Sequence, residues 1–145
     1  MLRLAAFAVT SALAAAAAAA GPLPPLPAPL DGLLAPPDRL TIAMADTGNR
    51  QLDREYRLEC DPVGGDHPQA AGACARLDQL AKEGKDPFAP VSRRQLCTMQ
   101  HGGPATARIT GTWNGHRVDA TFRRTNGCEI SRWDELEPLL PSGRS

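Results

Sequence analysis

The sequence lacks an excess of either charge. Its 145 residues include 16 lysines and arginines and 16 aspartates and glutamates, so the formal net charge at pH 7 is zero. A dedicated binder of nucleic acid or of an anionic membrane needs a clustered basic surface, because much of its affinity comes from contacts with phosphates. The balanced charge therefore argues against both of these classes.

The sequence also lacks the motifs that mark common enzymes and metal sites. It contains no Gly-x-Ser-x-Gly element and no Cys-x-x-Cys pair, and His67, His101 and His116 do not have the spacing of metal ligands. We therefore expect no enzymatic activity, no metal and no cofactor. The alternative is a hydrolase that uses His101 or His116 with a cysteine, and it requires free thiols.

Long apolar segments are confined to the beginning of the chain. Residues 4–20 are apolar apart from Thr10 and Ser11, follow the basic Arg3, and end in an Ala-x-Ala cleavage pattern. This layout is typical of a secretory signal peptide. We expect residues 1–20 to be removed on export, leaving 15 basic and 16 acidic residues in a secreted, extracellular protein without membrane contact. An uncleaved N-terminal anchor is the alternative.

The rest of the chain divides by composition. Residues 21–38 are rich in proline, which favours extended backbone, and we interpret them as a leader or linker. A proline-rich ligand for a partner domain is the alternative interpretation. Residues 39–141 are expected to form one domain, and residues 142–145 a flexible tail.

The domain contains a mixture of strand and helix patterns. Residues 39–44 and 56–60 alternate apolar and polar side chains, as half-buried strands do. Residues 70–82 contain good helix formers with apolar residues on one face, and Gly84 comes after them. These patterns predict two strands followed by a helix.

The second half of the domain begins with a hairpin pattern. Asn114-Gly115 separates two alternating runs, 109–113 and 118–122, and both turn residues tolerate the positive φ of a type I′ turn. Ser131 is a possible cap for a short helix that Pro138 would end. Together the patterns predict an α+β fold, with an antiparallel sheet of about five strands and two helices packed on it.

Four cysteines remain in the expected mature chain: Cys60, Cys74, Cys97 and Cys128. An even number in an exported domain predicts two disulfides, although the sequence alone permits three connectivities. Pairing neighbours in sequence is the simplest expectation. A bridge at Cys97 would then tether an exposed loop carrying Met99. The alternative is that Met99 fills the core beside a stabilising disulfide.

Four motifs occur in a characteristic order: Tyr-x-Leu-x-Cys at 56–60, the helical segment 72–77, Cys-Thr-Met at 97–99, and a hairpin with a closing Cys-Glu at 111–129. Over residues 39–140 they resemble the Streptomyces subtilisin inhibitor family of secreted serine-protease inhibitors. The resemblance implies the pairing Cys60–Cys74 and Cys97–Cys128, and an antiparallel sheet with two helices. It also implies a homodimer formed by sheet packing.

The same resemblance implies a substrate-like, reversible inhibitor whose partner is an extracellular subtilisin-like serine protease. Met99 would be P1, the residue whose carboxyl side is attacked, and Gln100 would be P1′. Asn126 would support the loop by hydrogen bonds, or would simply form a turn before Gly127. The remaining protease-contacting residues would be Leu96, Cys97, Thr98 and His101.

Two features depart from the family pattern. Thr98 occupies P2, where members usually carry proline, so the backbone there is less restrained. Segment 100–104 is one residue longer than in the family, and Gly102-Gly103 should loosen the side after the reactive bond. The alternative function is therefore an inhibitor-fold binding module, or a protease substrate, that has lost tight inhibition.

Overall fold

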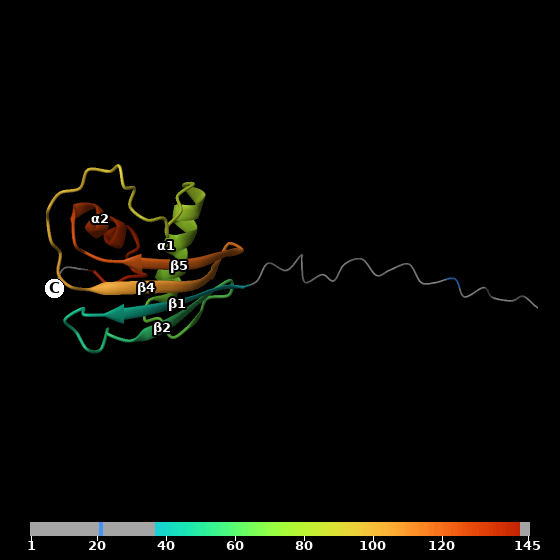
Figure 1. Cartoon of the computed structure of the whole chain (residues 1–145). Helices are drawn as coiled ribbons and strands as arrows, with labels where there is room; N and C mark the ends of the chain where they lie inside the picture. Colours follow the sequence, from blue (N-terminus) through green and yellow to red (C-terminus); the bar gives the residue numbers. More distant parts are fainter. Residues whose placement is uncertain (1–20, 22–36, 143–145) are drawn as a thin grey trace, which may run out of the picture. The chain divides into compact units, whose positions relative to one another are not determined.

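The computed structural model describes residue 21 and residues 37–142 (Figure 1). The chain divides into two units, Met1–Gly32 and Leu33–Ser145, and the strands and helices of the described residues belong to the second. The expected signal peptide at 1–20, most of the proline-rich leader and the last three residues of the expected tail lie outside the described residues.

Five strands form one antiparallel sheet in the order β3-β2-β1-β4-β5, and two helices accompany it. This arrangement confirms the predicted α+β fold class. The elements are, in chain order, β1 (Asp38–Ala45), β2 (Glu55–Cys60), β3 (Gly64–Gly65), α1 (Ala70–Lys82), β4 (Thr106–Trp113), β5 (His116–Phe122) and α2 (Gly127–Glu135).

The central strand β1 organises the core. It pairs with β2 on one side and β4 on the other, so that Ile42 lies opposite both Tyr56 and Ile109. Alternate residues of each strand point to one face of the sheet, where both helices pack. Leu77 of α1 and Trp133 of α2 are completely or almost completely buried there, which makes one hydrophobic core between the sheet and the helices.

The predicted hairpin is confirmed. Strands β4 and β5 pair from Ala107 opposite Phe122 to Trp113 opposite His116, and Asn114 and Gly115 both have positive φ, at 47° and 75°. The turn therefore has the backbone twist that matches two paired strands.

One predicted helix is confirmed and the other begins earlier than expected. Helix α1 has the predicted bounds, and Gly84 lies just beyond its end with a φ of +72°. Helix α2 begins after Asn126, whose side chain accepts from the main-chain N–H of Glu129, with 2.9 Å between O and N. Ser131 lies inside α2 and does not cap it, because the helix already has a capped start one turn earlier.

The second face of the sheet is polar and is covered by neither helix. Two ion pairs lie on it, Arg39 with Glu59 at 3.1 Å and Arg108 with Asp119 at 3.0 Å. Within residues 37–142 the sheet therefore presents an open face on the side away from the core.

The two disulfides have the predicted pairing. Cys60–Cys74 joins the end of β2 to α1, and Cys97–Cys128 joins the connection between α1 and β4 to the first turn of α2. Each bridge links neighbouring cysteines in the sequence, so the two closed loops do not overlap.

Candidate reactive loop

The connection between α1 and β4, residues 83–105, contains no helix or strand and passes over α2 (Figure 1). It carries the two most exposed large apolar side chains of the described residues, Leu96 at 97% and Met99 at 96%. Met99 therefore does not fill the core, which removes the alternative based on packing. Two exposed large apolar side chains three positions apart make this connection a candidate binding surface.

Two contacts fix the loop on the N-terminal side of Met99. The disulfide between Cys97 and Cys128 joins the loop to α2. The main-chain N–H of Gly127 donates to the carbonyl oxygen of Thr98, with 3.1 Å between N and O. Gly127 also allows the close approach itself, because a Cβ at this position would overlap the hydroxyl of Thr98.

Two hydrogen bonds fix the loop on the C-terminal side. The N–H of Gly102 donates to the carbonyl oxygen of Arg124 at 2.7 Å, and Arg124 Nε donates to the carbonyl oxygen of Gly102 at 3.2 Å. A Cβ on Gly102 would lie 3.0 Å from Arg124 Nε and from the side chain of Ile130. The expectation that Gly102-Gly103 loosens this side stays a prediction, although both main-chain polar groups of Gly102 are hydrogen-bonded to Arg124.

Arg124 is itself held firmly. Its guanidinium is buried, donates to Asp134 Oδ1 at 2.8 Å and lies over the ring of Trp133, with 5.6 Å to the ring centroid. A buried charge is retained only when it is paired and hydrogen-bonded. Sequence reasoning missed Arg124, since nothing in Arg123-Arg124 distinguishes a buried arginine from an exposed one.

Between these anchors lie only Met99, Gln100 and His101, and all three are exposed. We call residues 99–101 the bait span. Its only side-chain hydrogen bond among the described residues is local, from the N–H of Gly103 to His101 Nδ1 at 3.2 Å. The predicted reactive bond, Met99–Gln100, therefore lies in a short exposed segment that is fixed at both ends.

The predicted supporting residue, Asn126, acts at a different place from the one expected. Its side chain caps α2, and within the described residues it makes no hydrogen bond to the bait span or to its anchors. It fixes the start of the helix that carries Gly127 and Cys128. Asn126 thus bears on the loop through α2 and not by direct contact.

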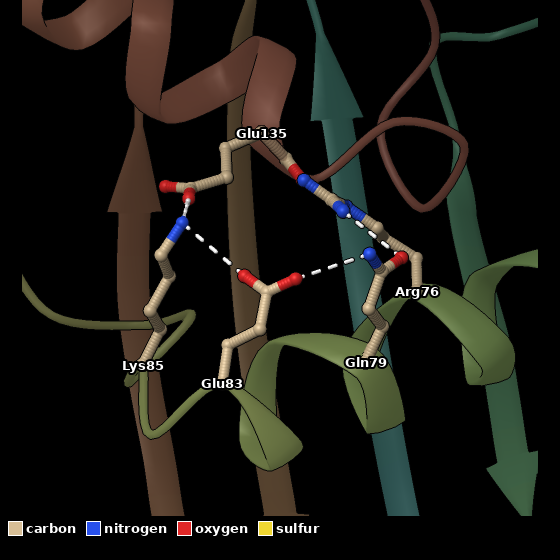
Figure 2. Close-up of polar contacts among 5 residues, drawn as sticks. All are labelled: Arg76, Gln79, Glu83, Lys85 and Glu135. Carbon is tan, nitrogen blue, oxygen red and sulfur yellow. Dashed lines mark hydrogen bonds and ion pairs between the residues drawn. The ribbon is translucent and has the colours of Figure 1, made fainter.

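The beginning of the connection is tied to both helices. Figure 2 shows a chain of polar contacts from Arg76 through Gln79 and Glu83 to Lys85 and on to Glu135, at the end of α2. Arg76 also donates to the carbonyl oxygen of Glu135 at 2.8 Å. The hydrogen bonds to Glu135 and then to Glu83 raise the pKa of the Lys85 ammonium. The C-terminal ends of α1 and α2 are joined by this network.

Arg132 of α2 holds the next part of the connection. Its guanidinium donates to three main-chain carbonyl oxygens, those of Ala89 at 2.7 Å, Phe88 at 3.2 Å and Thr121 at 2.7 Å. It also lies 3.8 Å from the centroid of the Phe122 ring. Helix α2 and the residues just before it therefore hold the connection at three places, around 88–89, at 97–98 and at 102.

Other kinds of site are not found in residue 21 or residues 37–142. No group of three or more His, Cys, Asp or Glu side chains could hold a metal ion in this part of the chain. All four cysteines are in disulfides, so the hydrolase alternative has no thiol to use. The helices described here are all too short or too polar to cross a membrane.

The sheet and its two helices form a scaffold that displays a short exposed segment fixed at both ends, as a loop-presenting binding protein would. The chain belongs to the subtilisin inhibitor-like family, whose model matches residues 37–126. This family is one of protease inhibitors and not of enzymes, as the sequence predicts.

Two relatives and one solved structure illustrate the similarity. Subtilisin inhibitor-like protein 1 of Streptomyces cacaoi is 36% identical over 83 residues, covering 54% of this chain and 72% of the relative. Protease inhibitor SIL-V2 of Streptomyces orinoci is 35% identical over 91 residues, covering 61% of this chain and 81% of the relative. A matching chain in the crystal structure of Streptomyces caespitosus sermetstatin in complex with Bacillus licheniformis subtilisin is 25% identical in sequence. The match covers 67% of this chain and 91% of that one. Its TM-score of 0.42 is too low to bear on the fold.

Proposed function

We propose that the chain is a secreted, substrate-like reversible inhibitor of subtilisin-type serine proteases, with Met99 at P1 and Gln100 at P1′. The main support for this proposal is that the bait span is exposed at 99–101 and is anchored on both sides, at 97–98 and at 102. A segment already fixed in one conformation loses little conformational entropy when a protease binds it. The names of two relatives, Subtilisin inhibitor-like protein 1 and Protease inhibitor SIL-V2, support the same assignment.

The two exposed apolar side chains favour a subtilisin-type target. Met99 is long and unbranched and would fill an apolar S1 pocket, while Leu96 would lie toward S4 as P4. A trypsin-like enzyme has a carboxylate in its S1 pocket and prefers a basic P1 residue. Because both exposed side chains are uncharged, the loop is matched to an apolar and not to an acidic subsite.

The disulfide gives a physical reason for reversibility. When the protease serine attacks the Met99 carbonyl carbon, the amine of Gln100 leaves but remains part of a segment anchored at Gly102. The acylated Met99 stays two residues from Cys97, which is bonded to Cys128. The leaving amine therefore has a high effective concentration beside the acyl group, and attack by that amine re-forms the peptide bond.

The proposal includes export and a homodimer. Export rests on the signal-peptide pattern at 1–20. Self-association through the open sheet face rests on a surface in which Thr41, Thr110 and Thr112 are half-buried at the centre and ion pairs lie around them. Light scattering of the mature protein tests the dimer, and a monomeric mass at micromolar concentration would reject it.

The decisive experiment is titration of subtilisin with the pure mature protein. We expect stoichiometric loss of protease activity and a slow, reversible complex. Met99→Lys should transfer inhibition toward trypsin, because a basic P1 residue suits an acidic S1 pocket. Val63→Lys is the matched control, since Val63 is the other exposed large apolar side chain of the described residues and lies outside the loop.

Two results would count against the proposal. One is the absence of inhibition at micromolar concentration. The other is complete and rapid hydrolysis of the Met99–Gln100 bond without a lasting complex, which would favour the alternative of a protease substrate. An unchanged preference in Met99→Lys would show that P1 lies elsewhere.

A further inference from the structure

A second exposed segment lies in the same connection, before the anchors of the bait span. We call residues 90–96 the basic span, because Arg93 and Arg94 lie at its centre. Both side chains are exposed and make no hydrogen bond or ion pair with any residue of the described part of the chain. The span is fixed only where it begins, by the bond from Arg132 to Ala89, and where it ends, by the disulfide at Cys97.

We propose that Arg93-Arg94 is a cleavage site for an arginine-specific serine protease, and that cleavage of the Arg94–Gln95 bond lowers the inhibitory activity proposed above. An S1 pocket containing a carboxylate selects an exposed guanidinium of this kind. The second, adjacent arginine adds a further positive charge for an acidic surface near that pocket.

The backbone of the basic span can open to meet a protease. Its main-chain N–H groups bond locally, from the N–H of Gln95 to the carbonyl oxygen of Ser92 at 3.0 Å and from the N–H of Arg94 to Ser92 Oγ at 3.3 Å. Both lie at exposed positions, where water replaces such bonds at little net cost. Exposed loops held this loosely are the usual places of proteolytic cutting.

A cut in the bait span and a cut in the basic span leave different products. The Met99–Gln100 bond lies between Cys97 and Cys128, so a disulfide still joins the two products after hydrolysis. The Arg94–Gln95 bond lies after Cys74 and before Cys97, so neither disulfide crosses it. Hydrolysis there adds water across the bond, giving a carboxylate on Arg94 and a free amine on Gln95. These ends can separate, so the bond does not re-form.

The two halves of the cut protein are expected to stay together without a covalent link. Strand β1 belongs to the first half and β4 to the second, and they pair at seven residue positions in the middle of the sheet. Both halves also contribute to the single core. Cleavage therefore removes a constraint on the loop and leaves the scaffold assembled.

The position of Leu96 determines the consequence for inhibition. After the cut, Gln95 and Leu96 form a two-residue end in front of Cys97, with no attachment on their N-terminal side. Leu96 then loses the restraint that holds it toward S4, and its ordering opposes binding. This second step rests on the proposed function, whereas the cleavage itself does not.

Limited digestion of the mature, disulfide-intact protein with trypsin tests the cleavage. We expect the first new N-terminus to be Gln95, and two fragments on a denaturing gel both with and without reductant. R93Q/R94Q should remove this cut. Arg50→Gln, which changes an exposed arginine in the turn after β1, is the matched control and should leave it in place. A first cut elsewhere, or fragments that separate only after reduction, would overturn the proposal.

Titration of subtilisin with the purified cut protein tests the consequence. We expect the inhibition constant to rise about tenfold relative to the uncut protein. An unchanged constant would overturn the role in regulation. If the uncut protein fails to inhibit subtilisin, the proposed function fails, while the mapped Arg94–Gln95 cut still decides the cleavage site.

Discussion

The main-chain N–H of Gly127 donates to the carbonyl oxygen of Thr98, with 3.1 Å between N and O. This bond joins the first residue of α2 to the residue before Met99. The conformation of the bait span therefore depends on the start of α2, which Asn126 caps. A change at the helix start is therefore expected to alter the conformation at the proposed reactive bond, Met99–Gln100.

Gly127→Ala should weaken inhibition without unfolding the protein. A Cβ at this position would overlap the Thr98 hydroxyl, push the loop away and lengthen the hydrogen bond. We expect the inhibition constant for subtilisin to rise about tenfold, which corresponds to about 1.4 kcal/mol and to the loss of one hydrogen bond.

Thr98→Ala in the same protein provides the control. Removing the hydroxyl relieves most of the overlap, so the double variant G127A/T98A should recover part of the lost affinity. An inhibition constant that stays at the wild-type value in Gly127→Ala would show that the approach of Gly127 to Thr98 does not matter for binding.

Arg124→Gln should make inhibition shorter-lived, because the protease should cleave the variant faster. The variant loses the side-chain bond to the carbonyl oxygen of Gly102 and the ion pair with Asp134, at a cost to stability of about 2 kcal/mol. The segment after the Met99–Gln100 bond is then less well fixed. The amine of Gln100 therefore moves away more often after the protease has attacked the Met99 carbonyl carbon. We expect faster hydrolysis of the Met99–Gln100 bond in the complex, which mass spectrometry can measure. The neighbouring Arg123→Gln is the control, because Arg123 is exposed, and it should leave the rate unchanged.

The two disulfides should separate stability from inhibition. By chain-entropy estimates, removing Cys60–Cys74 costs about 3 kcal/mol and removing Cys97–Cys128 between about 3 and 4 kcal/mol. Both C60A/C74A and C97A/C128A should therefore melt at lower temperature. Only C97A/C128A should be cleaved at Met99–Gln100 without forming a lasting complex. Equal loss of inhibition in the two variants at a temperature where both are folded would contradict the special role of the second bridge.

Asp66 should contribute stability that is lost in acid. The hydrogen bond from the main-chain N–H of Arg57 to Asp66 Oδ1, at 2.6 Å, holds the pKa of this carboxyl below its usual value. A lowered folded-state pKa means that the contribution is complete above the unfolded-state pKa, about 3.9, and disappears as the pH falls through the folded-state pKa.

The measurement is the melting temperature of wild type and Asp66→Asn between pH 7 and pH 2. Wild type should be the more stable at neutral pH, and the difference should close below about pH 4. Asp61→Asn is the control, because Asp61 is exposed in the same loop and makes no hydrogen bond through its side chain among the described residues. A difference that persists at pH 2 would contradict an electrostatic origin.

Arg132→Gln should release the start of the long connection. Three carbonyl oxygens lose their charged donor, and we expect a cost to stability of about 3 kcal/mol together with faster trypsin cleavage after Arg94. Lys85→Gln removes two exposed ion pairs, with Glu83 and Glu135, in the network of Figure 2 and should change neither quantity measurably.

Most of the scaffold could be predicted from the sequence because its signals are local. The alternation in β1 and β2, the face of α1 and the Asn114-Gly115 turn each depend on residues that are close in the chain. Strand β3 could not be predicted, since Gly64–Gly65 pair with β2 only after the loop has folded back. The start of α2 was missed because Asn126 resembles a turn residue as much as a helix cap.

The anchors of the candidate site could be predicted only in part. The cysteines and the resemblance indicated one of them, Cys97 with Cys128, in advance. The contacts of Gly127 with Thr98 and of Arg124 with Gly102 join residues more than twenty positions apart. Such contacts depend on the packing of α2 against the sheet, so no local sequence pattern predicts them. Gly102, one of the two glycines expected to loosen the loop, has its main chain hydrogen-bonded to the buried Arg124.

The anchoring of the bait span also has a meaning for protein engineering. Thr98 and Gly102 are held through main-chain atoms and Cys97 through its disulfide, so no anchor uses a side chain of residues 99–101. We therefore expect that other sequences can replace these three residues without disturbing the core. If residues 99–101 set the target preference as proposed, that preference should change with these three residues while thermal stability stays nearly constant.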